Sequence, residues 1–222
     1  MSEPQSRFAR YLTRRKMRRI WNLGGPAFMP PPPRAFAAFG KGSLIVAPAR
    51  VEGAEFVSIG KGVSILEHIW IIARAQPGQP PPRLVIGDRV QINRFTKIVC
   101  IGELIIEHDT MIGDNCYISD TYYLYDDPTK PIAAQGLAPS RPVHIGPDCH
   151  IAFRSTIRPG VTLAESVHVG SGSVVSEDMP ARTVVHGDPA RVIRRYNPER
   201  GEWVFVRQPA DPRAGEGTAD TV

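Results

Sequence analysis

The feature that most constrains this chain is a set of fifteen aliphatic residues between residues 59 and 175 that are spaced six apart within each of five groups. The positions form five groups of three: Ile59, Ile65, Ile71; Ile86, Ile92, Ile98; Ile106, Ile112, Ile118; Ile145, Ile151, Ile157; and Leu163, Val169, Val175. The residue after the aliphatic is often glycine, and the residue four positions after it is small or β-branched. No α-helix has a period of six, and a strand of period two would not restart with glycine so regularly.

A unit of six residues that contains a short strand and a turn explains both features. Three units close one triangular coil, with the aliphatic residues pointing inward and glycine relieving strain at the corner. Coils stacked about 4.8 Å apart would bury one continuous aliphatic column. A β-sandwich would need alternating patterns and hairpin turns, which are missing. The sequence therefore predicts an all-β fold, a parallel β-helix of about five coils.

Two long insertions interrupt the period. The first contains AQPGQPPP at residues 75–82, and the second is a long loop at residues 119–143 that begins within ISDTYYLYDDP, residues 118–128. Both leave the third face of a coil and return to the first, so we expect them at one vertex of the prism. Long loops on repeat scaffolds often carry function, which makes residues 119–143 the candidate functional lobe.

The rest of the chain divides by composition. We expect a basic, proline-rich N-terminal arm at 1–40, the β-helix at 41–178, a C-terminal cap with a basic segment at 179–206, and a disordered tail at 207–222. The sequence has neither a transmembrane stretch nor the apolar core of a signal peptide. Three cysteines without metal-ligand spacing, Cys100, Cys116 and Cys149, indicate free thiols in a reducing cytoplasm.

The N-terminal arm contains a basic block. Seven basic residues and no acidic residue lie between Arg7 and Arg19, a pattern that attracts phosphate groups. The block fits either a helix on a membrane surface or a solvated basic arm, and its loose apolar spacing favours the arm. We expect no nucleic-acid partner.

The C-terminal half carries recognisable motifs: PGVTL at 159–163, GSGSVV at 170–175, DMP at 178–180 and GDPARVIRR at 187–195. With these motifs the chain resembles the hexapeptide-repeat acyltransferases over roughly residues 40–196. It is most similar to the galactoside, maltose and xenobiotic O-acetyltransferase branch and its polysaccharide-modifying relatives. The resemblance implies a left-handed β-helix, a homotrimer with active sites between neighbouring subunits, and acyl transfer from acetyl-CoA or another acyl-CoA to a sugar or glycan precursor.

The chain departs from this family at the expected catalytic base. Many relatives open the long loop with a histidine at the position of Thr121 or Tyr123, whereas this chain has no histidine between His108 and His144. Tyrosine, with a pKa of about 10, is a weak base at neutral pH. His150 replaces a tryptophan that borders the thioester in relatives, so it becomes the leading candidate base.

Two loop residues complete the catalytic candidates. Asp120 would orient a histidine of the adjacent subunit, and Tyr123, with its neighbouring tyrosines, would stack on a sugar ring or pack the loop. His168 follows His150 by one coil and should lie on the same outer column. It is interpreted as an exposed ladder residue.

The resemblance also implies a cofactor site. Ala152, Ser171 and Gly172 match the tight turns where the pantetheine arm approaches the backbone. Arg191 and Arg194, with Arg182 as a third donor, match the end that holds the adenosine phosphates. The alternative is a solvated basic C-terminus.

Three functions compete. The first is a CoA-dependent acyltransferase, and the second is a trimeric binding or scaffold relative that lost its base. The third is a metal hydrolyase like the gamma-class carbonic anhydrases, with His144, His150 and His168 as zinc ligands. His144 and His150 fall on different faces of the predicted coil, and the C-terminal motifs are those of the transferases, so we expect no metal.

Overall fold

The structure, a computed structural model, describes residues 30–206. The basic block at Arg7–Arg19 and the tail at 207–222 therefore lie outside the described residues, as does most of the N-terminal arm. No helix among residues 30–206 combines the length and the apolar character that crossing a membrane requires.

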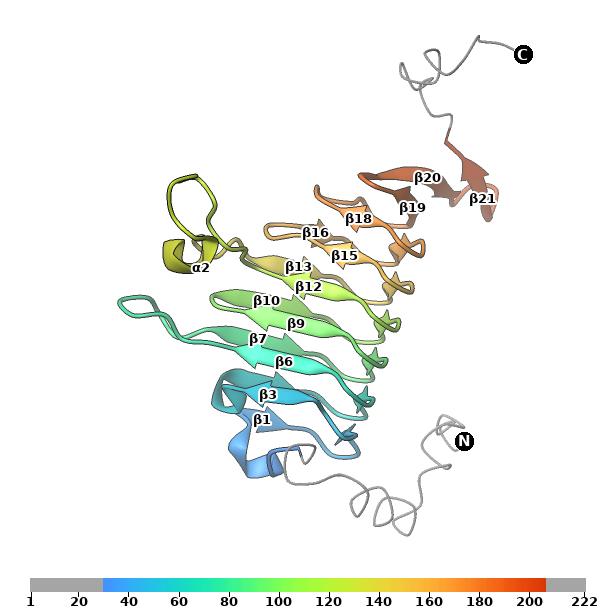
Figure 1. Ribbon diagram of the computed structural model, residues 1–222. Helices are drawn as coiled ribbons and strands as arrows, with labels where there is room; N and C mark the ends of the chain where they lie inside the picture. Colours follow the sequence, from blue (N-terminus) through green and yellow to red (C-terminus); the bar gives the residue numbers. More distant parts are fainter. Residues whose placement is uncertain (1–29, 207–222) are drawn as a thin grey trace, which may run out of the picture.

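The described residues form a triangular prism of six stacked coils (Figure 1). Each coil adds one strand to each of three faces, and the coil strands pair in parallel. Face A contains β1 (Ala38–Phe39), β4 (Val57–Ile59), β7 (Arg83–Ile86), β10 (Glu103–Ile106), β13 (Val143–Ile145) and β16 (Thr162–Leu163). Face B contains β2 (Leu44–Ile45), β5 (Ser64–Ile65), β8 (Gln91–Ile92), β11 (Met111–Ile112), β14 (His150–Ile151) and β17 (His168–Val169). Face C contains β3 (Arg50–Glu52), β6 (Trp70–Ala73), β9 (Lys97–Cys100), β12 (Tyr117–Ser119), β15 (Thr156–Ile157) and β18 (Val174–Val175).

Three further strands continue face B past the last coil. They are β19 (Thr183–Gly187), β20 (Ala190–Asn197) and β21 (Glu202–Phe205). β19 pairs in parallel with β17, and the other two pairings are antiparallel. Short helices lie at the first turns and in the long loop: η2 (Pro33–Ala35), η3 (Ala54–Phe56) and α2 (Ile132–Gln135).

The parallel β-helix predicted from the period is confirmed, with one coil more than the five expected. The added coil, residues 38–52, keeps the spacing of six through Phe39, Ile45 and Val51. Its first inward residue is aromatic, so a count of aliphatic residues starts one coil too late.

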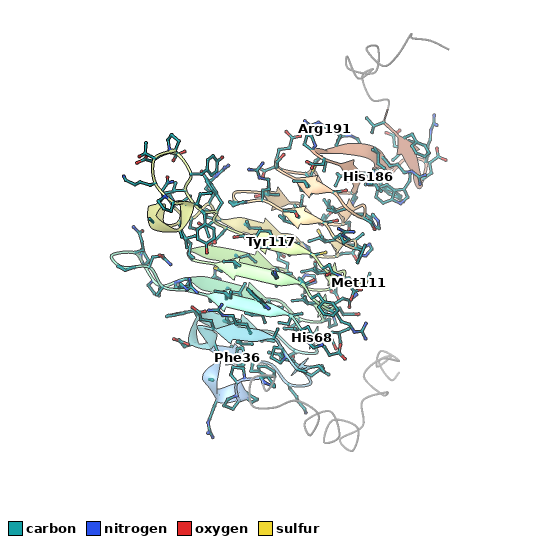
Figure 2. The ribbon with its side chains drawn as sticks, viewed as in Figure 1. Phe36, His68, Met111, Tyr117, His186 and Arg191 are labelled. Atoms are coloured by element: carbon teal, nitrogen blue, oxygen red, sulfur yellow. The ribbon has the colours of Figure 1, made fainter. Side chains whose placement is uncertain are left out.

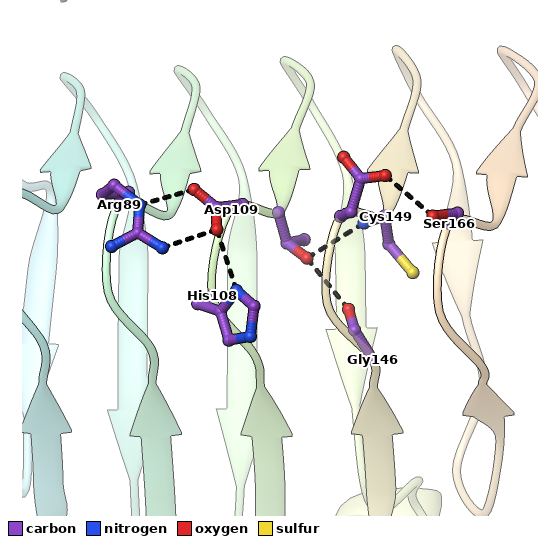
Figure 3. Close-up of polar contacts among 8 residues, drawn as sticks. Arg89, His108, Asp109, Gly146, Cys149 and Ser166 are labelled. Atoms are coloured by element: carbon purple, nitrogen blue, oxygen red, sulfur yellow. Dashed lines mark hydrogen bonds and ion pairs between the residues drawn. The ribbon is translucent and has the colours of Figure 1, made fainter. Parts of the chain in front are cut away.

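The core is the column of inward residues. All fifteen aliphatic positions are at most 2% exposed. The small residues four positions later are buried as well. The hydroxyls of the serines and threonines among them join successive coils. At the edge between faces A and B, Thr110 Oγ1 donates to Gly146 O at 3.0 Å and accepts from Cys149 N at 3.2 Å (Figure 3).

The glycines after the aliphatic residues serve a different purpose from the one expected. They do not adopt positive φ; the left-handed conformation lies two residues further on, for example at Arg89 after Gly87 and at Asn115 after Gly113. A Cβ at Gly87 would lie 2.7 Å from His108 N, and one at Gly113 would lie 2.9 Å from Phe153 N. Glycine is therefore required by the close approach of the next coil, and the expectation of corner strain was wrong.

Both insertions leave the prism at the same edge, between faces C and A. The proline-rich loop, residues 74–82, joins β6 to β7, and the lobe, residues 120–142, joins β12 to β13. Figure 1 shows both on one side of the prism, opposite the strands of face B. The predicted common vertex is confirmed.

Candidate active site

The catalytic candidates lie on opposite sides of one protomer. Asp120 and Tyr123 belong to the lobe at the C–A edge, and His150 lies on β14 of face B. Figure 1 shows the lobe and face B separated by the width of the prism. A single protomer therefore does not bring these residues together.

Asp120 is fully buried at the start of the lobe. Its carboxylate accepts hydrogen bonds from Ile101 N (3.0 Å), Gly102 N (2.8 Å) and Ser140 Oγ (2.8 Å). Arg141 N donates to its carbonyl at 2.8 Å. These bonds tie both ends of the lobe to the turn between β9 and β10. In this arrangement Asp120 positions the lobe and has no surface for a substrate.

The lobe presents aromatic side chains to solvent. Tyr122, Tyr123 and Tyr125 are 44%, 59% and 65% exposed, and the rings of Tyr122 and Tyr125 lie 6.1 Å apart. The backbone of Tyr123 pairs with Leu137, which closes the neck of the lobe. The arrangement offers flat apolar surfaces of the kind on which a sugar ring can stack.

Polar side chains hold the tip of the lobe in shape. Gln135 accepts from Asp127 N at 3.0 Å and donates to Asp127 O at 2.9 Å and Lys130 O at 3.0 Å. The carboxylate of Asp127 accepts from the backbone and hydroxyl of Thr129. This is the turn-forming role of aspartate before proline.

On face B, His150 contacts His168 of the next coil. The two residues are in register, their Nδ1 atoms lie 3.1 Å apart, and the rings meet edge to face with centroids 4.5 Å apart. Burial lowers the pKa of both imidazoles, and the neighbouring His168 lowers the pKa of His150 further. Both rings are therefore neutral at neutral pH, the state in which an imidazole accepts a proton.

Three cofactor candidates lie together at the edge between faces B and C. Ala152 N donates to Val169 O, and Gly172 N donates to Phe153 O, which stacks the turn containing Ser171 on the turn that follows His150. Gly172 has φ +72°, and no heavy atom lies within 4 Å of a Cβ built there. The open backbone of these turns adjoins the face that carries His150.

The same edge continues toward the C-terminus. The ring of His186 covers Gly170: a Cβ built on Gly170 would lie 2.7 Å from His186 Nδ1. Gly187 N donates to Ser173 Oγ at 3.2 Å. Arg191 follows across the hairpin, and Figure 2 shows His186 and Arg191 at the C-terminal end of the prism. The turns at 152–155 and 170–173 thus line one edge, and the backbone of Arg191 lies beside His186 at its C-terminal end.

The three candidate arginines differ in place and in partner. Arg191 forms an exposed ion pair with Glu177, and Arg194 lies over the ring of Phe205 at 4.0 Å. Arg182 lies at the other side of face B, at the A–B edge, where it pairs with Glu165 at 2.7 Å. The structure therefore separates Arg182 from the B–C edge.

The three histidines of the metal alternative do not converge. His144 lies on β13 of face A and bonds to Glu107, whereas His150 and His168 lie on face B. Residues 30–206 contain no group of three or more His, Cys, Asp or Glu side chains that could hold a metal ion. The three-histidine zinc site is thus not formed within the described residues.

Sequence reasoning missed a cavity of about 390 Å³ between the two insertions. Its lining includes Pro80, Pro81, Ile101, Leu137, Pro139 and Ser140. The only signal in the sequence was the common vertex of the two insertions. The cavity lies directly above the turn that Asp120 holds, so it depends on the same anchor as the lobe.

Solved structures share this fold. A point mutant of AntD, an N-acyltransferase from Bacillus cereus, in complex with dTDP and coenzyme A, matches with TM-score 0.62 and 22% identity over 75% of this chain and 88% of that one. The hexapeptide-repeat acetyltransferase VCA0836 from Vibrio cholerae, complexed with acetyl-CoA, matches with TM-score 0.52 and 21% identity over 73% and 72%. These likenesses show the fold, a left-handed parallel β-helix.

Curated relatives are acetyltransferases, although no protein-family model matches the chain. Rv3034c of Mycobacterium tuberculosis, a probable acetyltransferase, is 33% identical over 72% of this chain, and WbbJ of Escherichia coli, a putative lipopolysaccharide O-acetyl transferase, is 30% identical over 54%. The chain spans only 50% and 64% of these two proteins. It covers 68% of the putative colanic acid biosynthesis acetyltransferase WcaF of Escherichia coli at 30% identity, and 61% of this chain is matched. The chain belongs to the hexapeptide-repeat acetyltransferase family.

Proposed function

We propose that the protein transfers an acyl group, in the first instance acetyl, from an acyl-CoA to a hydroxyl or amine of a sugar or glycan precursor. The observation that carries the proposal is the B–C edge: the Ser171–Gly172 turn stacks on the turn that follows the neutral His150, and the β19–β20 hairpin that carries Arg191 continues the same face. The names of WbbJ and WcaF, and the bound coenzyme A of AntD and acetyl-CoA of VCA0836, support this donor and this class of acceptor.

The chemistry needs a base because an acceptor hydroxyl is a poor nucleophile. His150 Nε2 takes the hydroxyl proton as the acceptor oxygen bonds to the thioester carbonyl carbon. Backbone N–H groups of the edge stabilise the negative oxygen of the tetrahedral intermediate. The C–S bond then breaks, and the imidazolium of His150 returns the proton to the leaving thiolate of CoA.

The separation of His150 from the lobe supports a shared site. A homotrimer would bring the lobe of one protomer, with Tyr123 exposed, beside the B–C edge of the next. We place the reaction in the cytoplasm, where thiols stay reduced, because all three cysteines are buried and unpaired.

A binding protein without turnover is the second candidate. It is favoured by one observation: Thr121 and Tyr123 occupy the loop positions where many relatives carry a histidine. Such a protein would retain affinity for the sugar or for CoA and would release no CoA from acetyl-CoA.

The test combines binding and turnover. We expect acetyl-CoA to raise the melting temperature, and thiol release from acetyl-CoA to depend on an added sugar or nucleotide-sugar acceptor and on His150. Binding of acetyl-CoA without thiol release, for a panel of hexose, amino-sugar and nucleotide-sugar acceptors, would identify the second candidate. A protein that binds no acyl-CoA would contradict both the donor and the placement of its site.

A further inference from the structure

The proposed reaction requires a specific protonation state of His150. To act as a base, Nε2 must be unprotonated, so the single ring proton of the neutral imidazole must lie on Nδ1. A ring proton stays on Nδ1 when that nitrogen has an acceptor for it. The question is which group of the fold supplies that acceptor.

The adjacent coil supplies one. His168 Nδ1 lies 3.1 Å from His150 Nδ1, a hydrogen-bond distance at which one of the two nitrogens carries the proton. The contact follows from the fold, because β14 and β17 pair in parallel with His150 opposite His168. Among the hydrogen bonds of residues 30–206, His168 is the partner of the His150 ring.

We propose that His168 is the positioning residue of the proposed active site: it accepts the Nδ1 proton of His150 and thereby keeps His150 Nε2 free to take the acceptor proton. The inference rests on the function proposed above. His168 itself then carries its proton on Nε2. When His150 becomes an imidazolium, its Nδ1–H bond to His168 remains in place, and no ring has to turn.

The strands beside the pair add no charge. β11 places Met111 in register with His150, and β19 places Val184 in register with His168. A carboxylate, the usual partner of a catalytic histidine, is absent from these two strand positions. A neutral imidazole therefore takes the orienting role that aspartate has in the serine protease triad.

The charged residues of the flanking turns are engaged elsewhere. Asp148 accepts from Ser166 Oγ at 2.7 Å, as Figure 3 shows, and Glu165 pairs with Arg182. Arg154 lies over the ring of Phe153. The proton position on His150 is thus decided within the histidine pair.

Replacing His168 tests whether the proton shared by the two Nδ1 atoms belongs to His150. We expect His168→Ala to lower kcat about 10- to 1000-fold, less than the ~10⁴-fold loss caused by the wrong tautomer in a carboxylate triad, with the KM for acetyl-CoA unchanged. His168→Gln, whose amide oxygen accepts a hydrogen bond, should recover part of the loss. His108→Ala is the matched control, because His108 pairs with Asp109 at the A–B edge, away from the pair.

Nitrogen NMR of the six ¹⁵N-labelled histidines tests the tautomer without relying on activity. The wild-type protein should show His150 protonated at Nδ1, and His168→Ala should lose this preference. Protonation at Nε2 of wild-type His150 would overturn the inference while leaving the acyltransferase assignment intact. If His150→Ala retains full turnover, the assigned base is wrong, and the role of His168 falls with it.

Discussion

At the scale of single residues, a buried carboxylate organises the lobe. Asp120 accepts three hydrogen bonds and exposes none of its surface, so its contribution is geometric. It connects the turn between β9 and β10 with Ser140 at the return of the lobe. The tyrosines of the lobe and the cavity beside it both depend on this connection.

We predict that Asp120→Ala destabilises the protein. The change leaves the N–H groups of Ile101 and Gly102 without an acceptor, at about 1–3 kcal/mol for each unpaired buried group. Denaturant unfolding measures the loss, and Asp126→Ala, an exposed lobe residue, is the control that should change little. If Asp120→Ala abolishes turnover while the free energy of unfolding is unchanged, Asp120 acts in the chemistry instead.

The glycines between coils lead to a second prediction. Gly87→Ala places a Cβ within 2.7–3.1 Å of three backbone atoms of the next coil, and backbone cannot move aside cheaply. We expect a loss of about 1–3 kcal/mol or more, the range for overpacking. Gly78→Ala is the comparison: its φ of +72° is unfavourable for alanine, unlike that of Gly87, but no heavy atom lies within 4 Å of a Cβ built there. Equal losses for the two variants would contradict the close-approach explanation.

At the scale of elements, the two edges of face B carry different candidate residues. The B–C edge holds the turns at 152–155 and 170–173 and leads to the β19–β20 hairpin that carries Arg191, whereas Arg182 lies at the A–B edge. Both arginines are exposed and each pairs with one glutamate. They therefore form a matched pair for locating the cofactor phosphates.

We predict that Arg191→Ala weakens CoA binding and that Arg182→Ala does not. Loss of a charge-assisted hydrogen bond to phosphate costs about 1.5–3 kcal/mol, roughly a 10- to 150-fold change in Kd. Isothermal titration at two salt concentrations measures it, and the salt dependence should be smaller for Arg191→Ala. A stronger effect of Arg182→Ala would place the cofactor at the A–B edge.

The sequence predicts the features of these elements that repeat from coil to coil, and it does not predict those that depend on individual side-chain contacts. The spacing of six residues predicts the coils and the shared edge of the insertions, because each coil repeats the contacts of the one before. Eighteen residues between His150 and His168 correctly predict a common column. The spacing does not predict that the rings touch, since that depends on rotamers and on burial.

Asp120 and Arg182 show the limit more clearly. The role of Asp120 depends on amides of a turn 18 and 19 residues away, and no local pattern marks them. Arg182 follows the DMP motif closely, yet the chain has already reached another edge of the prism there. A motif match selects residues by their position in the sequence, whereas the site is defined by the edge of the prism on which the residues lie.

At the scale of the whole molecule, one triangular prism keeps its lobe and its histidine pair apart. Figure 1 shows the lobe and face B on opposite sides, and the shared site proposed above would join them through a second copy of the chain. We predict a trimer, and light scattering at micromolar concentration should give three times the chain mass of 24.4 kDa. A monomer that retains full turnover would contradict the shared site.

The most direct test of the shared site mixes two inactive variants. One is His150→Ala, and the other lacks the lobe tip, residues 124–136, which a short linker can replace because Tyr123 pairs with Leu137. Each variant alone should be nearly inactive and still form trimers.

Co-refolded in equal amounts, the two variants should regain about a quarter of the wild-type turnover, because random assembly joins an intact edge to an intact lobe at about one interface in four. Turnover that stays at the level of the separate variants, in mixed trimers confirmed by mass, would contradict the account.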